Sequence, residues 1–194
     1  TGFKVFGNSQ TNNSSQDEYI FMAIRRPNKP ASEGFEADEL FSVIGSAPLA
    51  GGFFDHGHLT DFSFYKYMAG TQQWGAQDRS RGEKDLSFDN NDLEGSFVNG
   101  NKWDMMDGYL NRGPGVGSYN SWAFRRTPNF FDVVCYDGSG AGQTVYHNLT
   151  VRPEMTWFKT RTADGHNTSA DRAWRAMHKD APILMGVDKG PEAF

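Results

Sequence analysis

Two pairs of neighbouring arginines are the residues whose type and spacing most suggest chemistry. Arg25-Arg26 and Arg125-Arg126 each follow an apolar, strand-like run and precede a proline-containing turn. Because successive side chains of a strand point to opposite faces, each pair places one guanidinium on each face of a strand end. The outward members could bind anionic sugars or lipopolysaccharide phosphates through paired hydrogen bonds. Salt bridges to nearby Asp and Glu, at a sheet rim or between subunits, are the alternative that we favour.

An acidic stretch supplies a candidate metal site. Asp89, Asn91, Asp92 and Glu94 offer oxygen ligands close together in the chain, and Ca²⁺ takes ligands of that type. The spacing departs from the EF-hand pattern at its fifth position, and a plain surface turn is the favoured alternative. Calcium is therefore the single cofactor that the sequence suggests, and we predict no other.

The sequence motifs point away from catalysis. Gly138-Ser139-Gly140 lacks the G-x-S-x-G pattern of a nucleophile elbow, and Cys135 lies within an apolar run. His56 and His58 stand one residue apart, without an HExxH pattern or a cysteine partner for zinc. We predict that the chain is not an enzyme.

Aromatic residues are the remaining candidates for ligand binding. Trp74, Trp103 and Tyr109 could stack on sugar rings, and we place Trp103 beside the four arginines as a predicted binding residue. Aromatic residues make up 14% of the chain, however, so most of them must build the core. Burial of these rings is thus the competing expectation.

Composition narrows the fold and the partners. The net charge of −5 argues against nucleic-acid binding, which needs a basic surface, and the apolar runs are too short for a membrane helix. The single Cys135 rules out an intrachain disulfide. Many aromatic residues together with 22 glycines of no fixed period predict an ordered, turn-rich β-protein.

The chain divides into short apolar runs separated by Gly, Pro and Asn. Residues 19–26 are apolar on both faces until the arginines, which predicts a strand in the middle of a sheet. Residues 119–126 and 130–136 predict two adjoining strands, and residues 70–100 predict long surface loops around a short strand near Leu86. Further strands are expected at 41–44, 60–68, 103–109, 144–147 and 154–161.

One segment near the C-terminus favours a helix. Ala170, Ala173, Trp174 and Met177 recur at helical spacing, and Ser169 could cap the N-terminus. We therefore expect at most one short helix, within residues 169–178.

The run from residue 122 to residue 161 resembles a module of tailed-phage structural proteins, particularly of marine phages. That module is related to the concanavalin-like (laminin-G-like) jelly-roll sandwiches. The likeness rests on Trp122-Ala123-Phe124-Arg125-Arg126, Phe130-Phe131-Asp132-Val133-Val134-Cys135-Tyr136, His147-Asn148-Leu149, Arg152-Pro153-Glu154-Met155, Trp157, Lys159 and Arg161, with Tyr19-Ile20-Phe21-Met22-Ala23-Ile24-Arg25-Arg26 upstream. The chain departs from the family at Thr150, where a Gly is usual, and over residues 169–178, where the family tends towards a strand.

The resemblance implies an all-β, antiparallel jelly-roll or concanavalin-like sandwich with long loops over residues 1–136. Residues 137–194 would begin a second similar module or form a C-terminal extension. Because the chain starts at Thr1 and stops at Phe194, we expect it to be a fragment of a longer protein.

The resemblance also implies a function without catalytic residues. We expect a virion structural protein, a fibre, tail or head-appendage module with scaffold and host-adhesion roles, located in the extracellular particle. Its partners would be other copies of itself, other virion proteins and cell-surface glycans. The alternative is a lectin-like carbohydrate-binding domain. A glycoside hydrolase is less favoured, because the acidic clusters at 33–39 and 89–94 do not lie on aromatic strands with the carboxylate spacing that such enzymes need.

Overall fold

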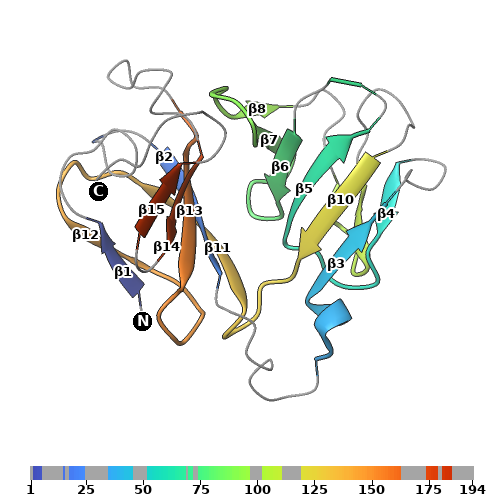
Figure 1. Cartoon of the computed structure of the whole chain (residues 1–194), viewed down its shortest axis with the longest axis horizontal. Coiled ribbons are helices and arrows are strands. Elements are labelled where there is room, and N and C mark those ends of the chain that lie inside the picture. Colours follow the sequence, from blue (N-terminus) through green and yellow to red (C-terminus); the bar gives the residue numbers. More distant parts are fainter. Residues whose placement is uncertain are drawn as a thin grey trace. The chain divides into compact units, whose positions relative to one another are not determined.

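The computed structural model describes residues 2–5, 15, 18–24, 35–45, 52–68, 70–71, 74–96, 102–110, 119–162, 174–178 and 181–184. Within these ranges the protein is all-β, with antiparallel pairing throughout and one 3₁₀ turn, η1 (Ala37–Glu39). The strands, drawn in Figure 1, are β1 (Gly2–Val5), β2 (Glu18–Ile24), β3 (Phe41–Ile44), β4 (Phe53–Asp55), β5 (Phe62–Tyr67), β6 (Trp74–Asp78), β7 (Lys84–Ser87), β8 (Gly95–Ser96), β9 (Gly108–Leu110), β10 (Tyr119–Phe124), β11 (Phe131–Asp137), β12 (Gln143–Tyr146), β13 (Met155–Thr160), β14 (Arg175–His178) and β15 (Ala181–Leu184).

The chain forms two compact units, and one is inserted into the other. The inserted unit comprises Ser32–Phe88 and Glu94–Arg126, and the terminal unit comprises Thr1–Ala31, Asp89–Leu93 and Thr127–Phe194. Residues 136 and 137, between which the sequence analysis places a boundary, both lie in β11. In addition, β13 pairs with β2. Residues far apart in sequence therefore share one sheet.

The inserted unit is built on a six-stranded sheet of order β3-β10-β5-β6-β7-β8. A two-stranded ribbon, β4–β9, packs on one face of this sheet through Phe54 and Tyr109, which cluster with Tyr65, Tyr119 and Trp103. The ribbon strands approach closely at Gly108, where a Cβ would collide with the backbone carbonyl of Phe54. Glycine is required there because the two backbones leave no space for a side chain.

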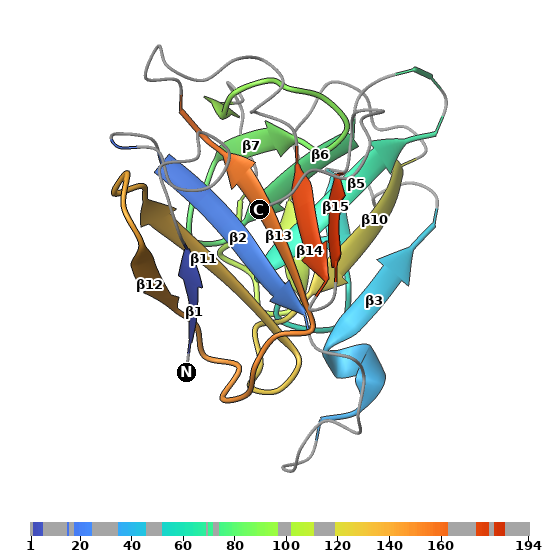
Figure 2. The ribbon, with the colours of Figure 1, turned by 60° about the vertical axis from the view of Figure 1, so that its left-hand side comes forward.

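The terminal unit is built on a five-stranded sheet of order β11-β2-β13-β14-β15, accompanied by a β1–β12 ribbon. Figure 2 shows β2 between β11 and β13, with β1 beside β12. Val145 of β12 packs with Phe21 and Phe158 on one face of this sheet. The expectation that 19–26 forms an interior strand is confirmed for β2, where Ile20, Phe21 and their neighbours are fully buried.

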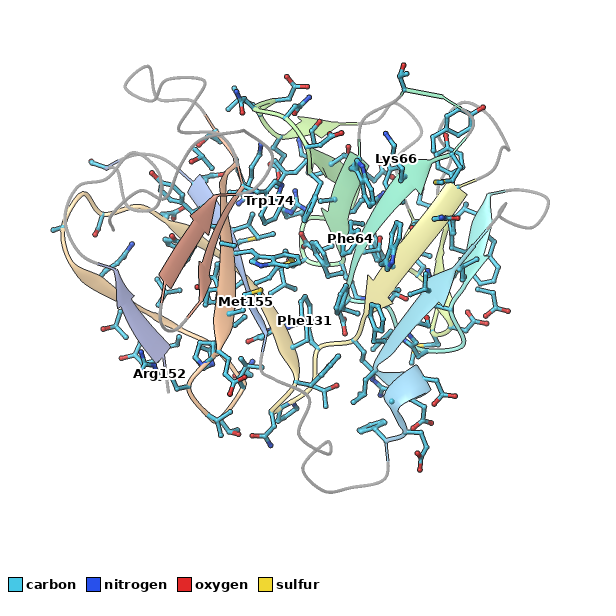
Figure 3. The ribbon with its side chains drawn as sticks, in the orientation of Figure 1. Phe64, Lys66, Phe131, Arg152, Met155 and Trp174 are labelled. Atoms are coloured by element: carbon cyan, nitrogen blue, oxygen red, sulfur yellow. The ribbon has the colours of Figure 1, made fainter. Side chains whose placement is uncertain are left out.

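Three expectations about individual elements are wrong. The segment 175–178, expected to be helical, is strand β14, which pairs with β13 and β15; residues 169–173 lie outside the described residues. Trp174, labelled in Figure 3, directly precedes this strand; it and Ala176 are both buried, and residues two apart along a strand share a face. The segment 70–100, expected to consist mainly of loops, contains the interior strand β6. Finally, β10 and β11 follow one another but belong to different sheets.

The all-β antiparallel class is thus established, and the layering in each unit is that of sheet against sheet, as in β-sandwiches. The jelly-roll strand order stays a prediction.

Candidate functional site

The two faces of the six-stranded sheet differ in chemistry because side chains alternate along each strand. On β5, Phe62, Phe64 and Lys66 point to one face, and Ser63 and Tyr65 point to the other. The face that carries Phe64 collects aromatic rings. The opposite face, beneath the β4–β9 ribbon, collects polar groups.

Four partly buried rings form what we call the aromatic patch: Phe64, Trp74, Phe88 and Trp122. The Phe64 ring lies 5.1 Å from that of Trp122 and 5.2 Å from that of Phe88, each at 18° between planes. Trp74 stacks on Trp122 at 5.1 Å and 27°. The patch arises because Trp122 is paired with Phe64 in the ladder of β10 and β5, which brings the rings of neighbouring strands together.

The aromatic patch lies at the more accessible end of its face. Farther along the same face Phe62, Ala76 and Leu86 are fully buried. Toward the other end, Lys66 stands opposite both Trp74 and Asn120 in the sheet register, and Figure 3 shows Lys66 beside Phe64 on β5. An ammonium group and a carboxamide, which together donate and accept hydrogen bonds, therefore border a set of near-parallel rings. Such a combination can hold a ligand that has both an apolar face and hydroxyl groups.

The polar face carries a buried network that we call the serine–histidine chain. The Ser42 hydroxyl lies 3.0 Å from His58 Nε2 and 2.7 Å from His56 Nδ1. His56 Nε2 lies 3.0 Å from Ser121 Oγ, which in turn lies 2.8 Å from the Tyr109 hydroxyl. Burial, with the charge of His58 as a smaller cause, lowers the pKa of His56 to about 3. Its imidazole is therefore neutral at physiological pH, with one ring nitrogen donating and the other accepting.

This chain has serine and histidine in contact but not the arrangement of a catalytic triad. Both ring nitrogens of His56 are taken by serine hydroxyls, so neither holds a carboxylate that would orient the ring. His56, Ser121 and Tyr109 are also buried beneath the ribbon. The arrangement fixes the ribbon to the sheet through hydrogen bonds.

The predicted arginine sites are resolved only in part, because Arg25 and Arg26 lie outside the described residues. The Arg125 guanidinium lies 4.3 Å from the centre of the Phe35 ring. The Arg126 backbone N–H donates to Asp61 Oδ2 at 2.7 Å. Burial raises the pKa of Asp61, and that N–H and the nearby arginine charges oppose the rise. Neither of these contacts is a salt bridge from an Arg125 or Arg126 guanidinium to a carboxylate, and the ion pair of Asp61 is with Arg79. Both interpretations of the arginine pairs stay predictions.

Trp103 is a core residue with only 5% of its surface exposed. Its indole N–H donates to the Gly82 carbonyl at 2.9 Å, and its ring stacks on Tyr109 at 5.1 Å between centroids. Arg79 lies over the other part of the indole, 5.8 Å from its centroid. Of the three aromatic residues considered for sugar stacking, Trp74 alone is partly accessible, because Trp103 and Tyr109 are both buried.

Glu94 and Asp92, two of the four predicted calcium ligands, contact other side chains, whereas Asn91 Oδ1 is buried with no hydrogen-bond partner within the described residues, and Asp89 is exposed. Glu94 accepts from Arg81 at 3.1 Å, and Arg81 is held on its other side by Asp78. The Asp92 backbone N–H donates a hydrogen bond to Asn90 Oδ1 at 2.9 Å. Among the described residues there is no group of three or more His, Cys, Asp or Glu side chains placed to hold a metal. Calcium binding at this loop stays a prediction.

Comparison with known protein families, with curated proteins and with solved structures finds no match to this chain. In the part of the chain that the structure describes, no helix has the length and apolar character needed to cross a membrane.

Proposed function

We propose that this chain is a non-catalytic adhesion module of a virion appendage, and that its aromatic patch binds cell-surface glycans. The observation that carries the glycan part is that Phe64 and Trp74 each stack on Trp122, and that all three rings are partly accessible and bordered by Lys66. A pyranose ring has an apolar C–H face that packs on aromatic rings, and its hydroxyls take hydrogen bonds from the groups at the rim. The virion part is supported by the resemblance of residues 122–161 to phage structural modules.

A rigid antiparallel sheet suits such a role. Three of the patch residues, Trp122, Phe64 and Trp74, come from the neighbouring strands β10, β5 and β6, whose backbones are fixed by the ladder, and Phe88 directly follows β7. The rings therefore keep their spacing without a ligand, so little side-chain freedom is lost on binding. Copies of the module in a symmetric appendage would add their individually weak contacts.

The glycan proposal is tested by substituting Trp74→Ala and measuring binding to immobilised polysaccharides and lipopolysaccharide by affinity electrophoresis. Loss of one stacking partner is worth about 1–1.5 kcal/mol, so we expect binding to weaken about tenfold. The matched control is Tyr146→Ala, which removes an aromatic ring that is 72% exposed on β12. Equal binding by both variants, at unchanged near-ultraviolet circular dichroism, would reject the patch as the site.

The virion proposal is tested separately by quantitative mass spectrometry of purified particles. A fixed ratio of peptides from this chain to those of the main coat protein is expected of a structural component. Glycan binding by a chain that is missing from particles would instead favour a free lectin-like protein.

A further inference from the structure

Three polar side chains lie on neighbouring strands of the inserted unit, on the face beneath the β4–β9 ribbon. Ser63 of β5 stands directly opposite Gln77 of β6 in the ladder. The β6–β7 register pairs Ala76 with Leu86, so one position further along Gln77 stands opposite Asp85. Ser63, Gln77 and Asp85, which we call the polar trio, therefore form one row across three strands and share one face.

Four side-chain atoms of the polar trio are buried and make no hydrogen bond within the described residues: the Ser63 hydroxyl, both amide atoms of Gln77 and Asp85 Oδ1. Ser63 and Gln77 have no exposed surface, whereas Asp85 is partly exposed and its carboxylate accepts a hydrogen bond from the Leu86 backbone N–H. Since the great majority of buried polar groups in proteins are paired, four such atoms in one row call for a shared partner.

The Tyr109 hydroxyl lies on the same face as the trio. It contacts Ser121 Oγ at 2.8 Å, and Ser121 stands opposite Tyr65, two residues along β5 from Ser63. Burial raises the pKa of Tyr109 to about 12; the Ser121 and Ser63 hydroxyls oppose this rise, and the charge of Asp85 adds to it. The charge of Arg81 lowers the pKa of Asp85, but the Arg81 guanidinium is held by Asp78 and Glu94.

We propose that Ser63, Gln77 and Asp85 form an internal site for ordered water next to Tyr109. Water fits the donor and acceptor set: it can donate to Asp85 Oδ1 and Gln77 Oε1, and accept from Gln77 Nε2 or the Ser63 hydroxyl. A metal cation fits poorly, because it offers no acceptor to the Gln77 N–H groups. The bound water would extend the serine–histidine chain from Tyr109 to Asp85, giving a continuous polar network beneath the ribbon.

The direct test is a crystal structure of the unaltered protein at a resolution where buried waters are resolved. The expected result is water density within hydrogen-bond distance of at least two members of the trio. An empty site, or density with the short, six-fold oxygen coordination of a cation, would overturn the proposal.

A second test uses the sign of a change in stability. Gln77→Leu keeps most of the side-chain volume and removes both amide atoms. If water bridges the trio, the variant loses two of its bonds and leaves Asp85 less satisfied, so Tm falls by several degrees. If no water is present, the variant removes two unpaired buried atoms and Tm stays the same or rises, which would contradict the site. Val145→Ala, an apolar truncation in the terminal unit, controls for nonspecific loss of packing.

Discussion

The two ribbons of this protein perform the same structural task with different chemistry. In the terminal unit, β12 of the β1–β12 ribbon presents Val145 to Phe21 and Phe158, an apolar contact. In the inserted unit, His56 directly follows β4 and Tyr109 lies in β9. Both side chains form hydrogen bonds with serine hydroxyls of the sheet. One ribbon is held mainly by burial of apolar surface, and the other adds a directional hydrogen-bond chain.

The difference shows how the contact between a ribbon and its sheet, which we call a joint, fixes the position of the ribbon strands along the sheet. Apolar contacts tolerate small shifts, because their energy depends on area rather than on angle. A buried hydrogen-bond chain loses partners when the strands shift, and each buried group left unpaired is costly. We therefore expect substitutions in the terminal unit to act through lost volume, and those in the inserted unit to act through lost pairing.

The largest effect is expected from Phe21→Ala in the apolar joint. Phe21 is fully buried and packs near Phe158 and Tyr136. Removing the ring should lower the free energy of unfolding by about 3–5 kcal/mol through lost transfer energy and a residual cavity. Urea unfolding measures the change. Phe21→Leu, which keeps more volume, should recover most of it; equal losses for both substitutions would show that volume is not the cause.

His56→Phe tests the hydrogen-bonded contact between ribbon and sheet, because it keeps an aromatic ring, slightly larger than imidazole, and removes both ring nitrogens. Ser42 and Ser121 would each lose a partner in a buried setting, so we expect a loss of about 2–3 kcal/mol. The ring can still stack near Tyr109 and Phe54. An unchanged or higher stability in urea unfolding would mean that the ribbon is held by ring packing alone.

Asp85→Asn should reveal that Asp85 and His56 contribute opposite pH dependences to the stability of the protein. Burial raises the pKa of Asp85 to about 7, so the folded protein retains a proton that the unfolded chain releases, and this contribution to stability falls as pH rises from about 4 to 7. The pKa of His56 is lowered to about 3, so the unfolded chain binds a proton that the folded protein does not, and this contribution rises with pH up to about 6.5. The two slopes oppose each other between about pH 4 and 6.5.

Removing Asp85 leaves the His56 slope uncompensated. The stability of the Asp85→Asn variant should rise with pH over that window by about 1 kcal/mol per pH unit more than that of the unaltered protein. Urea unfolding at pH 4.5, 5.5 and 6.5 measures both slopes. Parallel stability curves for the two proteins would show that Asp85 does not hold its proton in the fold.

The smallest effect, a gain, is expected from Thr150→Gly in the terminal unit. Thr150 has φ of 63°, in the left-handed region that a β-branched residue rarely adopts. Its hydroxyl donates to Asn129 Oδ1 at 2.8 Å, on the protein surface. Relief of the backbone conformation should outweigh that exposed bond and raise stability by about 0.5–1 kcal/mol. Thr144→Gly in β12, where the backbone is extended, should instead lower the Tm. If both substitutions lower the Tm, the backbone at Thr150 is not strained.

Thr150 also stands at the position where this sequence departs from the phage modules that it resembles. The phage modules that residues 122–161 resemble usually have Gly after His-Asn-Leu, and the position here has the backbone conformation that glycine adopts most easily. The resemblance itself and the jelly-roll strand order both stay predictions.

Elements with a strong local pattern could be predicted from the sequence, and elements defined by distant partners could not. The continuous apolar run of β2 and the alternation in β10, buried at every second residue, identified both strands. By contrast, β6 contains Gly75, Gln77 and Asp78, residues that locally favour loops, and it is a strand because β5 and β7 pair with it on both sides. The same reason explains β14, where pairing with β13 prevails over helical spacing.

The candidate site was predicted less well than the fold. The sequence offered Trp74 as a possible sugar contact, but we predicted Trp103, which is buried, as the binding residue, because exposure cannot be read from residue type. The aromatic patch depends on the register that brings Phe64 beside Trp122. The serine–histidine chain was missed, because Ser42, His56 and Ser121 are far apart in sequence and carry no motif. A serine at inward positions of both β5 and β10 was the one available signal.

The pairing of β2 with β13 has a consequence during synthesis of the chain. The amide of Glu18 is bound to the Thr162 hydroxyl, 144 positions away, whereas every strand of the six-stranded sheet lies between Phe41 and Phe124. At about 5–20 residues per second, translation separates the arrival of β2 and β13 at the ribosome exit by roughly ten seconds. The inserted unit can therefore fold first, while the fully apolar β2 waits for its second neighbour and needs protection from aggregation, by a chaperone or by early pairing with β11.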